Sequence, residues 1–207
     1  MGTHCCHHEP QPSPDTERHG RYRKVLYIAL IINAAMFGVE ILAGMRSGSV
    51  ALLADSLDFL GDAANYGISL FVLSMGLASR ARASLLKAAS MAAFGVWVLG
   101  NAAWHAWQGG PPEAPVMGMI GTLALMANLL VAVLLYAYRE GDSNMRSVWL
   151  CTRNDALGNV AVLLAALGVF GTGSSWPDLL VAVVMASLAL SAAWQVLSQA
   201  RRELATV

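Results

Sequence analysis

Charged residues are scarce in this chain: only 13% of its 207 residues are Asp, Glu, Lys or Arg, where soluble domains average about 25%. The 13 basic and 13 acidic residues give a formal net charge of zero, so no basic field attracts nucleic acid. Only three cysteines occur, and two of them, Cys5 and Cys6, are adjacent, which excludes a disulfide framework. So little charge indicates a surface that faces lipid more than water.

Apolar residues make up 57% of the chain and come in long runs rather than in a periodic scatter. A transmembrane helix needs about 20 mainly apolar residues, and backbone groups in lipid must be hydrogen-bonded within the protein, which favours helices for such runs. We therefore predict an all-α membrane protein, a bundle of six transmembrane helices. The predicted spans are 24–45, 50–75, 84–107, 116–138, 143–170 and 176–198.

Basic residues gather on one side of this predicted bundle, and only Arg46 falls on the other side. Such a bias predicts that both termini are cytoplasmic, in agreement with an even number of spans. Residues 1–20 are predicted to be a disordered arm, 21–199 the six-helix domain and 200–207 a short cytoplasmic tail. The basic residues assigned to the cytoplasmic side are Arg18, Arg21, Arg23, Lys24, Arg80, Arg82, Lys87, Arg139, Arg146, Arg201 and Arg202.

The second predicted span carries three acids, Asp55, Asp58 and Asp62. Ionisable groups at bilayer depth cost about 2.5–3.5 kcal/mol each on insertion scales, so they need a reason to be there. Spacings of three and four residues put all three on one helix face, and Asn65 continues the stripe. Stacked carboxylates repel one another unless protons or cations neutralise them, so this face predicts a site for positive charge.

The fifth predicted span carries a matching set, because Cys151 and Asp155 are four residues apart and share a face. At about 1.5 Å per residue, these residues and the aspartates of the second span fall near the bilayer midplane. Carboxylates with a thiolate suit zinc, whereas oxygen ligands alone would favour manganese or magnesium. The predicted metal ligands are Asp58, Asp62, Cys151 and Asp155, with Asp55, Asn65, Asn154 and Asn159 as further candidates.

A second cluster of potential ligands lies in the N-terminal arm, in the run His4, Cys5, Cys6, His7 and His8. Structural zinc sites separate their cysteines along the chain, so this adjacent run does not predict a rigid site. Its composition indicates metal binding. Two interpretations stay open: the arm captures metal, or it is only a solvated tail.

Three other polar residues have simpler interpretations. Glu40 shares a helix face with Asn33 and is expected to hydrogen-bond a neighbour rather than face an aqueous pathway. Asp178 is expected to be a first-turn acid of the last helix, and His105 an interfacial residue. No nucleophile–base pair and no nucleotide-binding loop occurs, so an enzyme is not predicted.

The stretch 33–66 resembles the first two spans of the cation diffusion facilitator family of metal–proton antiporters. It contains GMRSGSVALLADS, which enters the second span, followed by the Asp58-x-x-x-Asp62 pair. The run NDALGNVAVLLAA in the fifth span is similar to the family's second ligand pair, His-x-x-x-Asp. Asp155 matches the aspartate of that pair and Cys151 stands where the family has histidine, with Asn154 as the neighbouring alternative.

The resemblance implies export of a divalent metal in exchange for protons by alternating access. Zinc is expected first, then cadmium, with cobalt, iron, nickel and manganese behind, and no cofactor is expected. It also implies a homodimer, here held by transmembrane helices, because only nine residues follow the last span and the family's cytoplasmic C-terminal domain is not expected. The short links between the spans favour a location in a prokaryotic inner membrane. The alternatives are a metal-binding sensor or accessory subunit that does not transport, a passive cation channel and a pump for organic cations.

Overall fold

The computed structural model describes residues 14–71, 77–137 and 143–205, and every regular element in these ranges is an α-helix. The predicted all-α fold with six helices is therefore confirmed for the described part of the chain. The helices are α1 (Pro14–Ser47), α2 (Val50–Phe71), α3 (Leu77–Gln108), α4 (Ala114–Tyr136), α5 (Ser143–Thr172) and α6 (Trp176–Ala205).

Several of these helices extend beyond the predicted spans. α1 begins at Pro14 rather than near Lys24, and α3 begins at Leu77 rather than near Ser84. α6 continues through Arg201 and Arg202, which are both exposed. Hydropathy marks only the stretch that fits hydrocarbon, whereas a helix continues as long as its backbone hydrogen bonds do.

Glycine and proline set the turns that join the helices. Gly48 follows α1 and Gly173 follows α5, with φ of 70° and 62°, a left-handed conformation that ends helices and that glycine adopts without strain. The amide of Gly173 donates to the carbonyl of Val169 at 2.8 Å, which closes the last turn of α5. α4 begins after Glu113 and has a proline in its first turn. The missing N–H of proline costs nothing there, because the first N–H groups of a helix have no partner within the helix.

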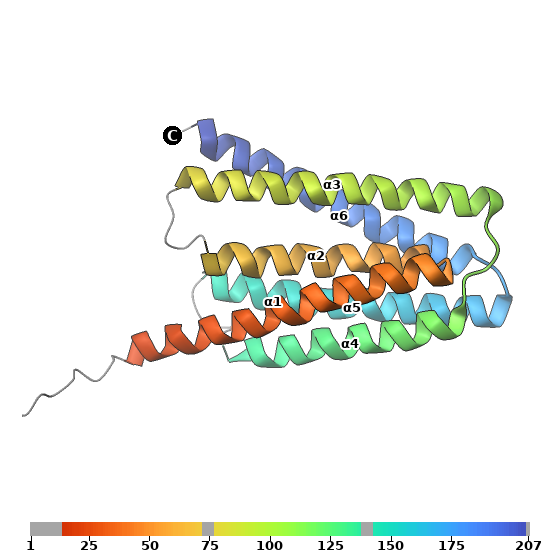
Figure 1. Cartoon of the computed structure of the whole chain (residues 1–207), viewed down its shortest axis with the longest axis horizontal. Coiled ribbons are helices and arrows are strands. Elements are labelled where there is room, and N and C mark those ends of the chain that lie inside the picture. Colours follow the sequence, from red (N-terminus) through yellow and green to blue (C-terminus); the bar gives the residue numbers. More distant parts are fainter. Residues whose placement is uncertain (1–13, 72–76, 138–142, 206–207) are drawn as a thin grey trace, which may run out of the picture.

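The helices run side by side, and the first residues of α1 and the last of α6 lie at the same end of the bundle (Figure 1). We call this the terminal end; the turns α1–α2, α3–α4 and α5–α6 lie at the opposite end, the turn end (Figure 1). α3 packs chiefly on α6, α1 on α2 and α4 on α5, while α2 also touches α3, α5 and α6. α2 is thus the central helix of the bundle.

Five of the described helices contain a stretch long and apolar enough to cross a membrane. α2 is left out of this set because every 18-residue stretch within it holds all three aspartates. It packs against α1, α3, α5 and α6, and two of its three acids, Asp55 and Asp62, are buried. The five qualifying stretches are Gly20–Ser47, Leu85–Gln108, Ala114–Tyr136, Asp155–Thr172 and Trp176–Arg202.

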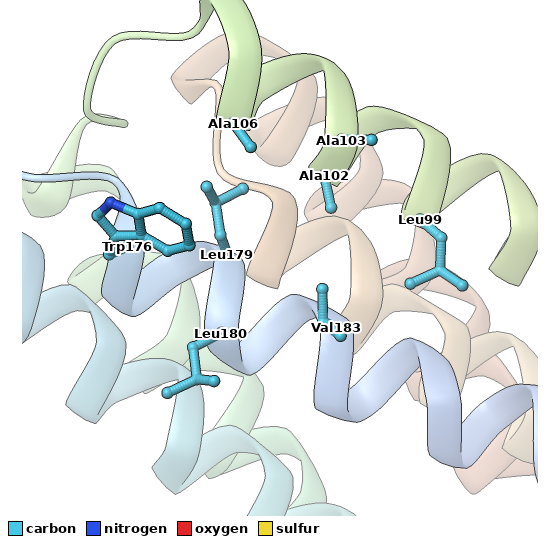
Figure 2. Close-up of a pocket in the computed structure, with 8 residues that line it drawn as sticks. All are labelled: Leu99, Ala102, Ala103, Ala106, Trp176, Leu179, Leu180 and Val183. Atoms are coloured by element: carbon cyan, nitrogen blue, oxygen red, sulfur yellow. The ribbon is translucent and has the colours of Figure 1, made fainter.

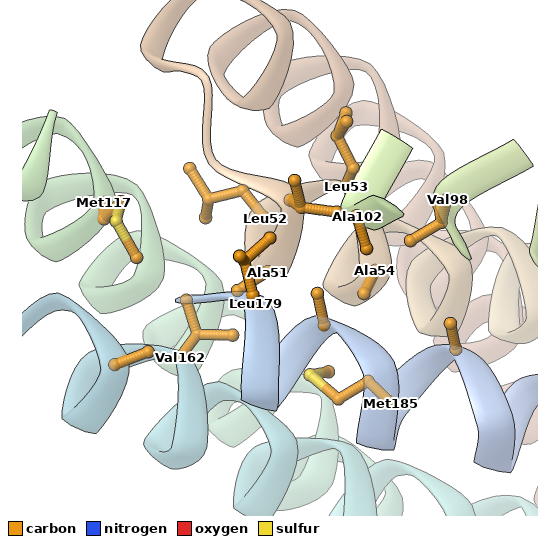
Figure 3. Packing of buried hydrophobic residues seen from close by; sticks show 14 of the residues in the cluster. Ala51, Leu52, Leu53, Ala54, Val98, Ala102, Met117, Val162, Leu179 and Met185 are labelled. Carbon is orange, nitrogen blue, oxygen red and sulfur yellow. The ribbon is translucent and has the colours of Figure 1, made fainter. Parts of the chain in front are cut away.

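The first turns of α2 form the centre of the packed core. Alanines there let neighbouring helices approach closely, which matters in lipid because apolar surface gains little by leaving hydrocarbon. α1 comes equally close, since a Cβ on Gly44 would stand 2.9 Å from a methyl of Leu53. Around the buried run Ala51–Ala54, Figure 3 shows Val98 and Ala102 of α3, Met117 of α4, Val162 of α5, and Leu179 and Met185 of α6.

Candidate functional site

A cavity of about 680 Å³, which we call the aspartate cavity, lies between α2, α3, α5 and α6. Three of the predicted ligands line it: Asp58 and Asp62 from α2, and Asp155 from α5. The structure thus brings together acids that lie nearly 100 residues apart in the sequence. Asn65, one of the further candidates, lines the same cavity.

The two α2 aspartates of the cavity differ in their surroundings. Asp58 is half-buried, whereas Asp62 is buried with 5% of its surface exposed. The hydroxyl of Tyr66, one turn along, donates to Asp62 Oδ2 at 2.6 Å. A donor of this kind holds a carboxylate in one orientation.

α5 comes very close to α2 beside these acids. A Cβ on Gly158 would stand 3.6 Å from Asp58 Oδ2 and 3.8 Å from Asp55 Oδ1, and 3.3 Å from the Met185 methyl. Among the side chains that the structure describes, no three from His, Cys, Asp and Glu form a cluster tight enough to hold one metal ion. The cavity therefore presents acids from two helices that would have to draw together around an ion.

The remaining predicted ligands fall outside the description. α5 includes the backbone of Cys151 and Asn154, but their side chains are not described. The arm residues also lie outside the described residues: His4, Cys5, Cys6, His7 and His8. Their roles as ligands stay predictions.

Asp55 and Asn159 belong to a buried polar network next to the aspartate cavity, whose lining includes neither of them. The Asn128 amide donates to Asn159 Oδ1 at 2.8 Å, and the Asn159 amide donates to Asp55 Oδ2 at 2.7 Å. All three side chains are buried. These hydrogen bonds join α4, α5 and α2. Asn128 was not among the residues singled out from the sequence, although it is a lone amide in an apolar span.

Glu40 of α1 completes this buried region. Its side chain is fully buried and lies beside the carboxyl group of Asp55, with Asp58 also near. Two carboxylates are both acceptors, so a direct hydrogen bond between them requires a proton on one of the two. Glu40 thus meets a neighbouring acid and does not line the aspartate cavity.

Asp178 has a larger role than the one expected from its place in the first turn of α6. Its carboxylate accepts hydrogen bonds from the Ser49 hydroxyl at 2.6 Å, the Val50 amide at 2.8 Å and the Ala51 amide at 3.1 Å. These amides open α2 and have no partner within their own helix. Asp178 therefore caps α2 and ties it to α6 at the turn end.

Lys87 has a position that the sequence did not predict. The sequence places it among the basic residues of the cytoplasmic side, and in the structure it lines the aspartate cavity. Its ammonium group donates to Asn65 Oδ1. Because α3 begins at Leu77, Lys87 lies about three turns along this helix.

A second cavity, of about 380 Å³, lies between α3 and α6 near the turn end (Figure 2). Its lining consists of alanine, leucine and valine side chains and the ring of Trp176 (Figure 2). None of these groups can ligate a cation, so this cavity is not a candidate metal site.

Comparison with known proteins agrees with the helices and the acids. Residues 26–205 match the family model for the cation efflux transmembrane domain. The zinc transporter ZitB of Escherichia coli is 28% identical over 195 residues, which cover 88% of this chain and 62% of that protein. A cadmium, cobalt and zinc/H(+)-K(+) antiporter of Bacillus subtilis is 26% identical over 193 residues, 86% of this chain and 61% of the relative.

The metal cation efflux system protein CzcD of Cupriavidus metallidurans is 26% identical over 187 residues, 84% of this chain and 59% of that protein. The chain thus spans about six-tenths of the length of these curated relatives. The match over nearly all of the helical bundle confirms the resemblance inferred from the aspartate motifs. Together with its apolar helices, it shows that this integral membrane protein belongs to the cation efflux family.

Proposed function

We propose that the protein exports divalent metal cations across a membrane, with zinc as its first substrate and cadmium next. The observation that carries the proposal is the aspartate cavity, where Asp58 and Asp62 of α2 meet Asp155 of α5. Acids at this depth are costly in a membrane protein and mark ion pathways. The relatives' names, which specify zinc, cadmium and cobalt, support the same class of substrate.

Exchange for protons follows from the chemistry of the ligands. A carboxylate must lose its proton before it binds a metal, so metal arriving from one side releases protons, and protons from the other side displace the metal. Alternating access would come from movement of the α3–α6 pair against α2 and α5, because the cavity lies between these two groups of helices. Both termini are proposed to be cytoplasmic, and the proposed direction of transport is out of the cytoplasm of a prokaryotic cell.

Selectivity would depend on the fourth ligand. A Cys151 thiolate, one turn before Asp155 on α5, would favour zinc and cadmium. Asn154 in its place would leave only oxygen ligands and shift preference toward harder ions such as manganese. A homodimer is proposed to form through the transmembrane helices, where small side chains permit close packing.

Transport by isosteric variants tests the site. Radioactive zinc efflux from cells, or uptake into inverted membrane vesicles, should be lost in Asp58→Asn and in Asp155→Asn, because each removes a charged ligand without changing shape. Glu113→Gln is the matched control, since Glu113 is exposed and its side chain caps no helix. Normal zinc transport by Asp58→Asn would overturn the site. Zinc binding without transport by the parent chain would favour a sensor or accessory subunit instead.

A further inference from the structure

One basic side chain shares the aspartate cavity with the three acids. Among the described residues that line this cavity, Lys87 is the sole Lys or Arg. It comes from α3, and its ammonium group donates to the side-chain oxygen of Asn65 on α2, which lines the cavity too. Asn65 follows Asp62 by three residues, so the ammonium is held beside the same face of α2 that carries the acids.

A lysine in a transmembrane helix often extends toward the nearest interface, where its charge meets water. Lys87 is instead half-buried and hydrogen-bonded across to α2. The ammonium group has three donors and no acceptor, and the cavity around it offers amide and carboxylate oxygens. The position is therefore one in which a positive charge is well solvated by the protein itself.

We propose that Lys87 is a resident cation of the aspartate cavity, which lowers the cavity's affinity for a divalent ion and so permits the ion's release. This inference rests on the proposed metal transport and adds the residue that sets its affinity. A fixed unit charge repels a divalent ion in the same cavity, and at about 10 Å and an effective dielectric constant of about 20–40 the repulsion changes affinity by at least tenfold. While Lys87 holds the Asn65 oxygen, that oxygen is also withheld from the ion.

The alternative is that Lys87 only fastens α3 to α2 through its hydrogen bond. Lys87→Gln separates the two roles, because an amide can still donate to Asn65 but carries no charge. Lys87→Arg keeps the charge, and Lys24→Gln makes the same change on α1, where Lys24 is exposed and does not line the cavity.

The experiment measures zinc binding to the purified full chain in lipid nanodiscs by equilibrium dialysis with radioactive zinc. We expect Lys87→Gln to lower the Kd at least about tenfold and to slow zinc release in proportion, while Lys87→Arg and Lys24→Gln bind like the parent. Thermal melting of each variant in the same nanodiscs identifies any variant that misfolds. If Lys87→Gln misfolds, Lys87→Met takes its place, and its Kd is compared with the Kd values of the parent and of Lys87→Arg. A Kd for Lys87→Gln that is higher than that of the parent, or lower by less than twofold, overturns the inference.

Asp58→Asn distinguishes this failure from failure of the proposed function. If the parent binds zinc and Asp58→Asn does not, the site stands, and an unchanged Kd in Lys87→Gln then overturns the role of Lys87 alone. If the parent binds no zinc, the proposed function and the role of Lys87 both fall.

Discussion

The hydrogen-bonded chain through Asn159 predicts a large effect from one small substitution. The Asn159 side chain accepts from Asn128 at 2.8 Å and donates to Asp55 at 2.7 Å, and all three groups are buried. Asn159→Ala removes both bonds at once. It leaves Asn128 without its acceptor and Asp55 Oδ2 without its donor at a depth where water cannot replace them.

The expected loss follows from these two bonds. A buried polar group left without its partner costs about 1–3 kcal/mol, while hydrogen bonds between transmembrane helices average about 0.6 kcal/mol and reach about 1.7 kcal/mol. Since two bonds disappear and α4 and α2 both lose a tie to α5, we expect the free energy of unfolding to fall by about 2–3 kcal/mol.

The assay is reversible unfolding in mixed detergent micelles, with Asn101→Ala as the matched control. Asn101 lies on α3, and its amide donates to the Trp97 carbonyl of the same helix, at 2.9 Å in an exposed position. Its loss should cost no more than about 0.5 kcal/mol. Equal losses of unfolding free energy in Asn159→Ala and Asn101→Ala would refute the reasoning, because the buried network would then contribute nothing beyond a local hydrogen bond.

Three more substitutions test single contacts. Gly158→Ala should slow zinc transport about tenfold, because the new methyl stands 3.3 Å from the Met185 methyl and 3.6 Å from Asp58 Oδ2 and so fills the space in which α2 and α5 would draw together around an ion. Gly100→Ala, whose methyl meets no atom within 4 Å, should stabilise its helix by about 0.5–1 kcal/mol with transport unchanged, and equal transport by both variants would contradict this. Asp178→Ala should lower the free energy of unfolding by at least about 1 kcal/mol, since two amides and a hydroxyl lose their acceptor; a melting curve like that of the parent would count against the cap. Tyr66→Phe should weaken zinc binding about tenfold, as loss of a group that orients a metal ligand does, and an unchanged Kd in dialysis would show that the 2.6 Å hydrogen bond has no such role.

Much of the fold could be predicted because lipid imposes strict rules on sequence. Long apolar runs have to be helices, and the spacing of Asp58 and Asp62 fixes the face that they share. The position of Asp155 along its helix then predicted that it lies level with them, and in the structure all three aspartates line one cavity. Position along a helix and phase around it are local properties, which the order of residues determines.

What could not be predicted depends on how the helices are turned toward one another. Asp55 shares a face with Asp58 and Asp62 by spacing, yet it is fully buried, accepts from Asn159 of α5 and does not line the cavity. The partners Asn128 and Asn159 are 31 residues apart, and no periodicity relates them. The contact of Lys87 with Asn65 also depends on how α3 is turned toward α2, which a count of basic residues does not determine.

The central claim is that the aspartate cavity exchanges zinc for protons. Its most direct test is purified protein in liposomes that enclose a pH dye, with zinc flux and internal pH recorded together for the parent and for Asp155→Asn. The account predicts zinc flux with proton flux in the opposite direction, both lost in the variant. Zinc flux without any change of pH, or coupled flux that persists in Asp155→Asn, would contradict it.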